Sequence, residues 1–247
     1  MEIEATFAVP DRTVYRRLAR LRSLAHFTLR PTRVSQIADR YFDTADGRLR
    51  AGGFACRLRT EGDVIVATLQ GLGGATGAVH RRAEEEVRLP EWTPDPAAWP
   101  ESPAHTLALE LTAGAPLLPL FDLAQRRACA HLLEGERRVA DLSLDAGRVD
   151  LTVLRRPLQS SYYELEIELA PAGHETDLAA IVAELTGKWA LRGESRSKYE
   201  RALELLRRRQ AAEALALTPE ERRTLEAHAA AGAAPLGRRA AAVLGWE

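Results

Sequence analysis

The chain has 247 residues and a mass of 27.2 kDa, with 34 Lys and Arg against 35 Asp and Glu, and hence a formal net charge of -1. This balance argues against broad attraction to nucleic acid or to a membrane surface, and no apolar run approaches the roughly 18 residues that a membrane span requires. Two widely separated cysteines, Cys56 and Cys129, and an N-terminus without a basic segment followed by an apolar one predict free thiols and a cytoplasmic protein.

Strand patterns dominate the first ninety residues. Residues 2–9 alternate between polar and apolar side chains, which predicts a strand that ends at Pro10. Asp11 then caps a predicted helix over 12–25. Further strands are predicted over 33–44, 54–60, 63–70 and 79–89, with a hairpin at residues 61–62 and a Gly-rich loop at 71–78.

The second half continues this pattern with more helix. Residues 90–119 hold much of the proline and predict a connection with a short helix. The remaining predicted strands cover 126–133, 137–145, 147–154 and 162–170, with tight hairpins at Gly135 and at residues 145–147. Helices are predicted over 177–192 and 197–209.

The chain is predicted to divide at about residue 210. Residues 1–210 form the main domain, and the Ala-rich segment 211–247 is a short helical appendage, a linker or a truncated downstream domain. Thr218 and Glu221 have the spacing of a capping box. About nine strands, mostly linked by hairpins, predict an α+β fold, in which helices flank an antiparallel sheet or closed barrel.

The polar faces of the predicted strands are unusually rich in Glu and Arg. In the segment YYELEIELA, Glu164, Glu166 and Glu168 share one face, about 7 Å apart. At an effective dielectric near 20, each adjacent pair repels by about 2 kcal/mol. A face open to water carries such charges at little cost. An enclosed face requires opposite charges, and it would suit oxyanions bound by arginines and divalent cations bound by carboxylates.

The order of motifs resembles the CYTH family, the triphosphate tunnel metalloenzymes. The opening EIEAT is similar to that family's Glu-x-Glu-x-Lys signature. It is followed in order by YFDT at 41–44, RLR at 57–59, TLQ at 68–70, HRRAEEEV at 80–87, Arg127, Asp145, ELEIEL at 164–169 and SKY at 197–199. The resemblance covers about residues 1–205. It implies a closed eight-stranded antiparallel tunnel with flanking helices, a triphosphate or polyphosphate ligand, and Mg²⁺ or Mn²⁺ as cofactor.

The resemblance also implies roles for individual residues. Metal ligands, or groups that support them, are expected at Glu2, Glu4, Asp145, Glu164, Glu166 and Glu168. A phosphate clamp is expected from Arg57, Arg59, Arg82, Arg127 and Lys198, with Glu84 assisting a metal or fixing Arg82. Glu2 and Glu4 are also the expected catalytic carboxylates, since either could orient the attacking water.

Two positions depart from the family pattern. Thr6 stands where the signature has lysine, and Gln70 stands where a lysine usually follows the Arg-x-Arg hairpin. Losing two charge-assisted contacts of about 1.5 to 3 kcal/mol each would weaken binding by about a hundredfold or more. Three functions therefore remain open. The first is metal-dependent hydrolysis of tripolyphosphate or an organic triphosphate, and the second is binding of triphosphate or polyphosphate without cleavage. The third, ranked last because no adenine pocket is evident, is cyclisation by a class IV type of adenylate cyclase.

Overall fold

The computed structural model describes residues 2–151, 153–154, 157–215, 218, 220–221 and 223 of the chain. Its strands and helices have the following bounds: β1 Glu2–Val9, α1 Arg12–Leu18, β2 Ser23–Leu24, β3 Phe27–Asp43, α2 Arg48–Ala51, β4 Phe54–Glu61, β5 Val64–Gly71, β6 Ala75–Thr76, β7 Val79–Arg82, β8 Glu84–Leu89, the 3-10 helix η1 Pro96–Ala98, α3 Pro103–Thr112, β9 Leu118–Glu134, β10 Arg137–Leu151, β11 Leu158–Leu169, α4 Glu175–Gly187, β12 Arg192–Gly193 and α5 Lys198–Leu215.

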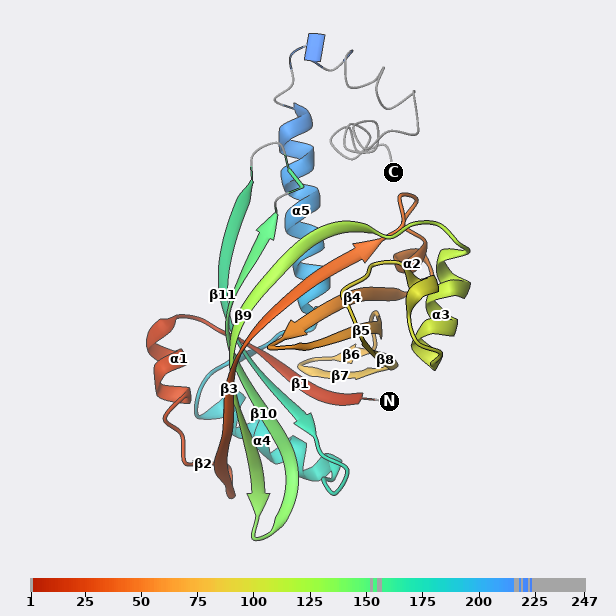
Figure 1. Cartoon of the computed structure of the whole chain (residues 1–247). Coiled ribbons are helices and arrows are strands. Elements are labelled where there is room, and N and C mark those ends of the chain that lie inside the picture. Colours follow the sequence, from red (N-terminus) through yellow and green to blue (C-terminus); the bar gives the residue numbers. More distant parts are fainter. Residues whose placement is uncertain are drawn as a thin grey trace.

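A single, strongly curled antiparallel sheet dominates the described part of the chain (Figure 1). Its strand order is β6-β7-β1-β11-β10-β9-β3-β4-β5-β8, with β12 paired to β1 and β2 paired to β3. The α+β class is confirmed. The expected closed eight-stranded tunnel is wrong, because the twelve strands of the described residues form an open half-barrel.

The segment 79–89 explains why the sheet stays open. It was predicted as one long strand, but it divides at Ala83 into β7 and β8. β7 pairs with β1 at one edge of the sheet, and β8 pairs with β5 at the other edge. Gly71 N donates to Ala83 O at 2.8 Å, so the break itself is anchored to the end of β5. The two edges are therefore linked by the chain and not by a continuous ladder of hydrogen bonds.

The three longest strands supply most of the curl. β3, β9 and β10 have 15 to 17 residues each, and their register shifts between Pro31 and Arg33, between Tyr41 and Phe42, and between Arg138 and Ala140. Such bulges bend a strand and increase its twist. The long strands thereby wrap around the inner face of the half-barrel.

The hairpin predicted at residues 145–147 does not exist, because β10 continues through them as one strand. Gly147 has a packing role instead of a turn role. A Cβ at this position would lie 2.3 Å from Cζ of Tyr162, whose ring lies against the glycine from β11. The hairpin at Gly135 is confirmed, with a φ of 60° in the turn between β9 and β10.

Helices cover the outside of the sheet and close part of its inside. The predicted helix over 12–25 is shorter, ending at Leu18, and Asp11 caps it by accepting from Thr13 N and Val14 N. α1 and α4 pack on the outer face of β1, β10 and β11, while α2 and α3 pack on β4, β5 and β8. α5 contributes Tyr199, Ala202 and Leu206 to a third cluster, which includes Leu123 and Val149. Alternation along β9 and β10 places these two on the concave face, so α5 fills one end of the half-barrel.

Only a few residues of the predicted appendage are described. Thr218 and Glu221 form the predicted capping box: Thr218 N donates to Glu221 Oε2 at 2.9 Å, and Glu221 N donates to Thr218 Oγ1 at 3.2 Å. The rest of the prediction for 211–247 beyond α5 lies largely outside the described residues. Among the residues described, no helix is long and apolar enough to cross a membrane. Cys56 and Cys129 are free thiols, as predicted.

Candidate functional site

The inward faces of the strands converge on one cavity of about 530 Å³. Because side chains alternate along a strand, every second residue of β1, β4 and β11 points to this side. The cavity wall is made by Glu2, Glu4, Thr6, Tyr41, Arg57, Arg59, Gln70, Arg82, Glu84, Glu86, Arg127, Asp141, Ser143, Glu164, Glu166, Glu168, Ser197 and Lys198. The wall therefore carries eight carboxylates and five basic side chains.

The structure brings together all the residues that the sequence singled out for the site. Every one of them lines the cavity except Asp145, which is fully buried and ion-paired to Arg127 and Lys198 of the wall. Thr6 and Gln70 also line the cavity. Both departures from the family pattern therefore remove a cation from the wall itself.

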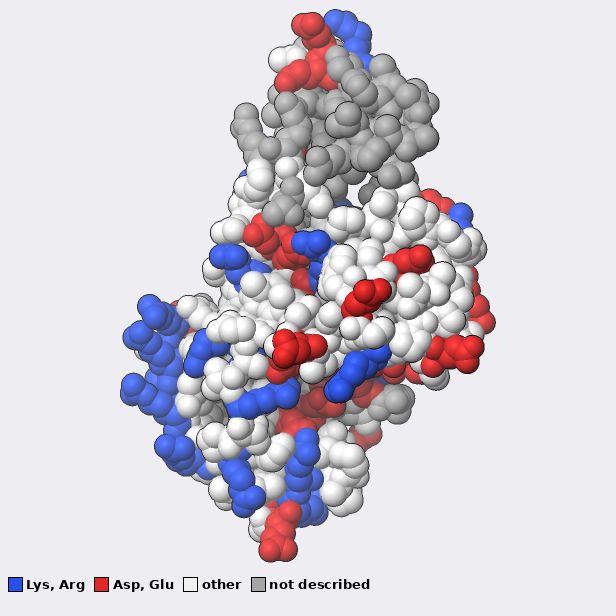
Figure 2. Space-filling view, viewed as in Figure 1, with Lys and Arg blue, Asp and Glu red and all other residues white. Residues whose placement is uncertain are grey.

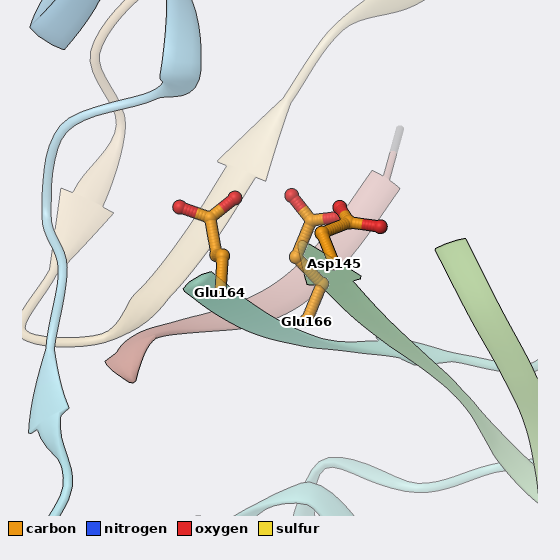
Figure 3. A group of neighbouring side chains, drawn as sticks. All are labelled: Asp145, Glu164 and Glu166. Carbon is orange, nitrogen blue, oxygen red and sulfur yellow. The ribbon is translucent and has the colours of Figure 1, made fainter. Parts of the chain in front are cut away.

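One group of buried charges is centred on Lys198, the first residue of α5. Its Nζ lies 2.9 Å from Asp145, 2.8 Å from Glu164 and 2.7 Å from Glu166. Figure 3 shows these three carboxylates projecting from the same side of β10 and β11. Arg127 adds a bidentate pair with Asp145, at 2.9 and 2.7 Å, and a contact of 2.6 Å with Glu166.

The pKa values in this group follow from those partners. Burial alone would raise the pKa of Glu166, but Lys198 and Arg127 together hold it well below its usual range. The same two cations lower the pKa of Asp145 against its burial. Burial lowers the pKa of Lys198, but the three carboxylates outweigh this and raise it. The group is therefore a set of mutually neutralising ions with the proton kept on Lys198.

Arg57, Arg59 and Arg82 differ in how fully they are bound. Arg59 donates to both oxygens of the buried Asp39, at 2.7 and 2.9 Å. Arg57 has only long contacts, 3.3 Å to Thr68 Oγ1, 3.6 Å to Glu84 and 3.7 Å to Glu86. Arg82 pairs with Glu4.

The Nε atoms of Arg57 and Arg82 are buried and have no hydrogen-bond partner. A buried guanidinium N–H without a partner is costly. Each of these two N–H groups is therefore an unsatisfied donor in the wall of the cavity.

The carboxylates of the cavity outside the Lys198 group have too few basic partners to balance their charge. Burial raises the pKa of Glu84, and the nearby Glu2 adds to it. Burial and Glu84 raise the pKa of Glu86, and burial and Asp141 raise that of Glu168. This side of the cavity therefore has an excess of negative charge, which favours a bound cation.

Two groups of carboxylates could hold a metal ion. Oxygens of Asp145, Glu164 and Glu166 lie within 4.8 Å of one another, but Lys198 already contacts all three. Glu4 faces Glu168 directly across the β1–β11 ladder, where opposite Cβ atoms are about 5 Å apart. Neither Glu2 nor Glu168 forms an ion pair within the described part of the chain. An all-oxygen donor set of this kind suits a hard divalent cation.

Sequence reasoning missed several residues that shape the site. Asp39 fixes Arg59 and also accepts from Gln125 Nε2 at 2.8 Å, and Gln125 Oε1 accepts from the Tyr162 hydroxyl at 3.0 Å. Arg201 of α5 pairs with Glu164. Asp39 lies on the same face of its strand as Tyr41 and directly opposite Arg59. The position of Asp39 in the alternating pattern of its strand was therefore a usable signal. For Arg201 the signal was its spacing of three residues from Lys198 in a predicted helix.

The inner face of this open antiparallel half-barrel thus holds both a carboxylate cluster and an arginine cluster. In a comparison with family models, the model of the CYTH domain matches residues 1–203. The chain belongs to the CYTH family, as the ordered motifs predicted.

Solved structures from several organisms have the same fold. HpAC1 from Hippeastrum, a proposed adenylyl cyclase with a dominant triphosphatase activity, is 18% identical, with 83% of this chain and 96% of that chain covered and a TM-score of 0.55. A proposed adenylate cyclase from Bacillus halodurans is 20% identical, with 81% and 96% covered and a TM-score of 0.56. The PH1819 protein from Pyrococcus horikoshii OT3 is 16% identical, with 83% and 99% covered and a TM-score of 0.53. These similarities establish the fold.

Proposed function

We propose that the protein is a metal-dependent phosphohydrolase that acts on inorganic tripolyphosphate or an organic triphosphate inside the half-barrel. The observation that carries this proposal is the cavity wall, where five basic side chains face eight carboxylates. Phosphoryl transfer requires mainly positioning and neutralisation of charge. The triphosphatase activity of HpAC1, which shares the fold, supports the same choice of reaction.

The excess of carboxylates makes a metal necessary to this function. A triphosphate is strongly anionic, and it would enter a wall of net negative charge only together with cations. Glu2 and Glu168, which form no ion pair in the described part of the chain, would hold Mg²⁺ or Mn²⁺ together with Glu4, which faces Glu168 across the β1–β11 ladder. When bound, the metal supplies neutralisation of phosphate oxygens. Asp145, Glu164 and Glu166 instead hold Lys198 and Arg127 in position.

The chain's own residues then have separate tasks. Arg57, Arg59, Arg82, Arg127 and Lys198 would donate to phosphate oxygens from the N–H groups that face the cavity. Glu84 lies between Arg57 and Gln70 and limits their movement. Glu2 orients a water whose oxygen bonds to the terminal phosphorus while the bond to the bridging oxygen breaks. The products are orthophosphate and pyrophosphate from tripolyphosphate, or orthophosphate and the organic diphosphate from an organic triphosphate.

The test is phosphate release from tripolyphosphate with Mg²⁺, with Mn²⁺ and with neither. Glu4→Gln and Glu168→Gln are expected to lower metal-dependent release by about a hundredfold or more, comparable to the loss of one group that stabilises transition-state charge. Glu175→Gln is the control, since Glu175 is 62% exposed and lies on α4 outside the cavity. Full activity in both cavity variants would exclude this metal site.

A second candidate is a binding module for triphosphate or polyphosphate, favoured by Thr6 and Gln70 in the wall. The same assay separates the candidates when ATP is also supplied. Free phosphate indicates hydrolysis, and pyrophosphate with cyclic nucleotide indicates cyclisation. Thermal stabilisation by tripolyphosphate without any product indicates binding alone.

A further inference from the structure

A second charged feature lies on the outside of the molecule, over α1. Figure 2 shows Lys and Arg side chains gathering there, at the left of the view. The residues in this segment are Arg12, Arg16, Arg17, Arg20 and Arg22, and all five are exposed. None of them forms an ion pair with any residue that the structure describes, in contrast to the paired arginines of the cavity.

Helix stability explains only part of this set: Arg16 and Arg17 lie in the last turn of α1, where cations suit the helix dipole, but Arg12, Arg20 and Arg22 do not. Arg12 is the first residue of α1, at the end where the helix dipole disfavours a cation. Arg12 and Arg16 are four residues apart, a spacing at which like charges repel. The only carboxylate between residues 11 and 22 is Asp11, whose oxygen accepts from Thr13 N and Val14 N at 2.6 and 2.9 Å. It therefore serves the cap and neutralises none of the arginines directly.

Residues next to α1 extend the positive surface and limit the kinds of ligand that it can bind. Exposed Arg126 of β9 lies beside it, because its Nη1 is 3.4 Å from the Tyr15 hydroxyl. Tyr15 and Leu18 are buried in the core, so the helix has no apolar face to insert into a bilayer. Trp189 is covered by Arg17, at 5.1 Å. The surface therefore offers cations without an open aromatic ring on which a nucleobase could stack.

We propose that the α1 surface, formed by Arg12, Arg16, Arg17, Arg20, Arg22 and Arg126, binds inorganic polyphosphate. The helix places Arg12 and Arg17 about 7 Å apart along its axis, and the other arginines widen the surface. An extended chain of phosphates bridges such a surface, whereas a single phosphate contacts one part of it. The inference enlarges the ligand class of the proposed function, but it rests on other residues and is tested by binding alone.

The experiment compares the binding of labelled long-chain polyphosphate to wild type and to Arg16→Glu/Arg20→Glu at several salt concentrations. We expect at least a tenfold loss of affinity. We also expect the slope of log K against log salt to fall by about 0.7 per lost contact, the value for single strands. Stabilisation by tripolyphosphate, which depends on the cavity, should be unchanged. Arg16→Lys/Arg20→Lys should retain binding.

A matched control alters net charge equally but elsewhere. Arg207 and Arg209 of α5 are also exposed, so Arg207→Glu/Arg209→Glu should keep at least most of the affinity. The proposal would be overturned by an equal loss of polyphosphate affinity in this control or by unchanged affinity in the α1 variant. Tighter binding of single-stranded RNA or of phosphatidylserine vesicles at the same arginines would also overturn it. If polyphosphate binds through α1 but no triphosphate is hydrolysed, only the proposed function is refuted. If triphosphate is hydrolysed but polyphosphate binding does not depend on α1, only this inference is refuted.

Discussion

Lys198→Met is the most informative single perturbation of the site. It keeps a long apolar side chain but removes the charge that lies within 3 Å of Asp145, Glu164 and Glu166. The three carboxylates, whose oxygens lie within 4.8 Å of one another, would then be left with the guanidinium groups of Arg127 and Arg201. Breaking a buried ion pair by removing one partner costs about 3 to 5 kcal/mol.

This cost can be read as a thermal shift. For a chain of this size, 1 kcal/mol corresponds to about 2 to 4 °C, so metal-free Lys198→Met should unfold about 6 to 20 °C below wild type. Lys188→Met is the matched control, since Lys188 is the other lysine of the chain and is 73% exposed. Its effect should stay within about 0.5 kcal/mol.

Divalent cations should then stabilise the variant more than they stabilise wild type. Without Lys198, the three carboxylates become an open site for Mg²⁺ or Mn²⁺, and a ligand at one hundred times its dissociation constant adds about 2.7 kcal/mol. Differential scanning fluorimetry across a metal titration measures this difference. A metal-induced shift no larger in the variant than in wild type would refute the idea that Lys198 occupies a cation position.

Two further predictions concern the cavity wall. Gln70→Lys places a charge beside Glu84 and Glu2, which Gln70 Nε2 now contacts at 3.1 and 3.4 Å. Calorimetry should show tripolyphosphate binding about tenfold to a hundredfold tighter; unchanged affinity would mean that the ligand does not reach this position. Asp39→Asn should cost about 3 to 5 kcal/mol at pH 7. Burial raises the pKa of Asp39, but Arg59, with Arg57 and Lys198, outweighs burial and lowers it. The stabilisation by Asp39 is therefore present above about pH 4 and fades below, so urea unfolding should show the two proteins converging in acid.

Alternation along single strands was sufficient to predict the composition of the site. It placed Glu2 and Glu4 with Thr6, and the three glutamates of β11 with one another, and all of these line the cavity. The prediction succeeded because a single curled sheet encloses the cavity, so that each strand turns its whole polar face toward it. Alternation cannot show which charges meet across strands. The pairing of Arg127 with Asp145 depends on the β9–β10 register.

The wrong predictions concern continuity of the backbone. Asp145-Ala146-Gly147 has the composition of a turn, but here the glycine makes room for the Tyr162 ring in an adjacent strand. That contact joins β10 to β11 and is invisible in a local pattern. Likewise, 79–89 has a continuous strand pattern, and only the different partners of β7 and β8 divide it at Ala83. In both cases long-range pairing overrides the local signal.

The position of α5 accounts for the part of the site that no strand pattern could supply. Tyr199, Ala202 and Leu206 bury one side of this helix in the core cluster at the end of the half-barrel. Residues three or four apart share a helix face, so the same burial directs Lys198 and Arg201 together toward Glu164. Packing of apolar groups therefore sets the position of two cations in the site. Glu164 and Glu166 of β11 can lie together inside the protein because α5 brings these two positive charges next to them.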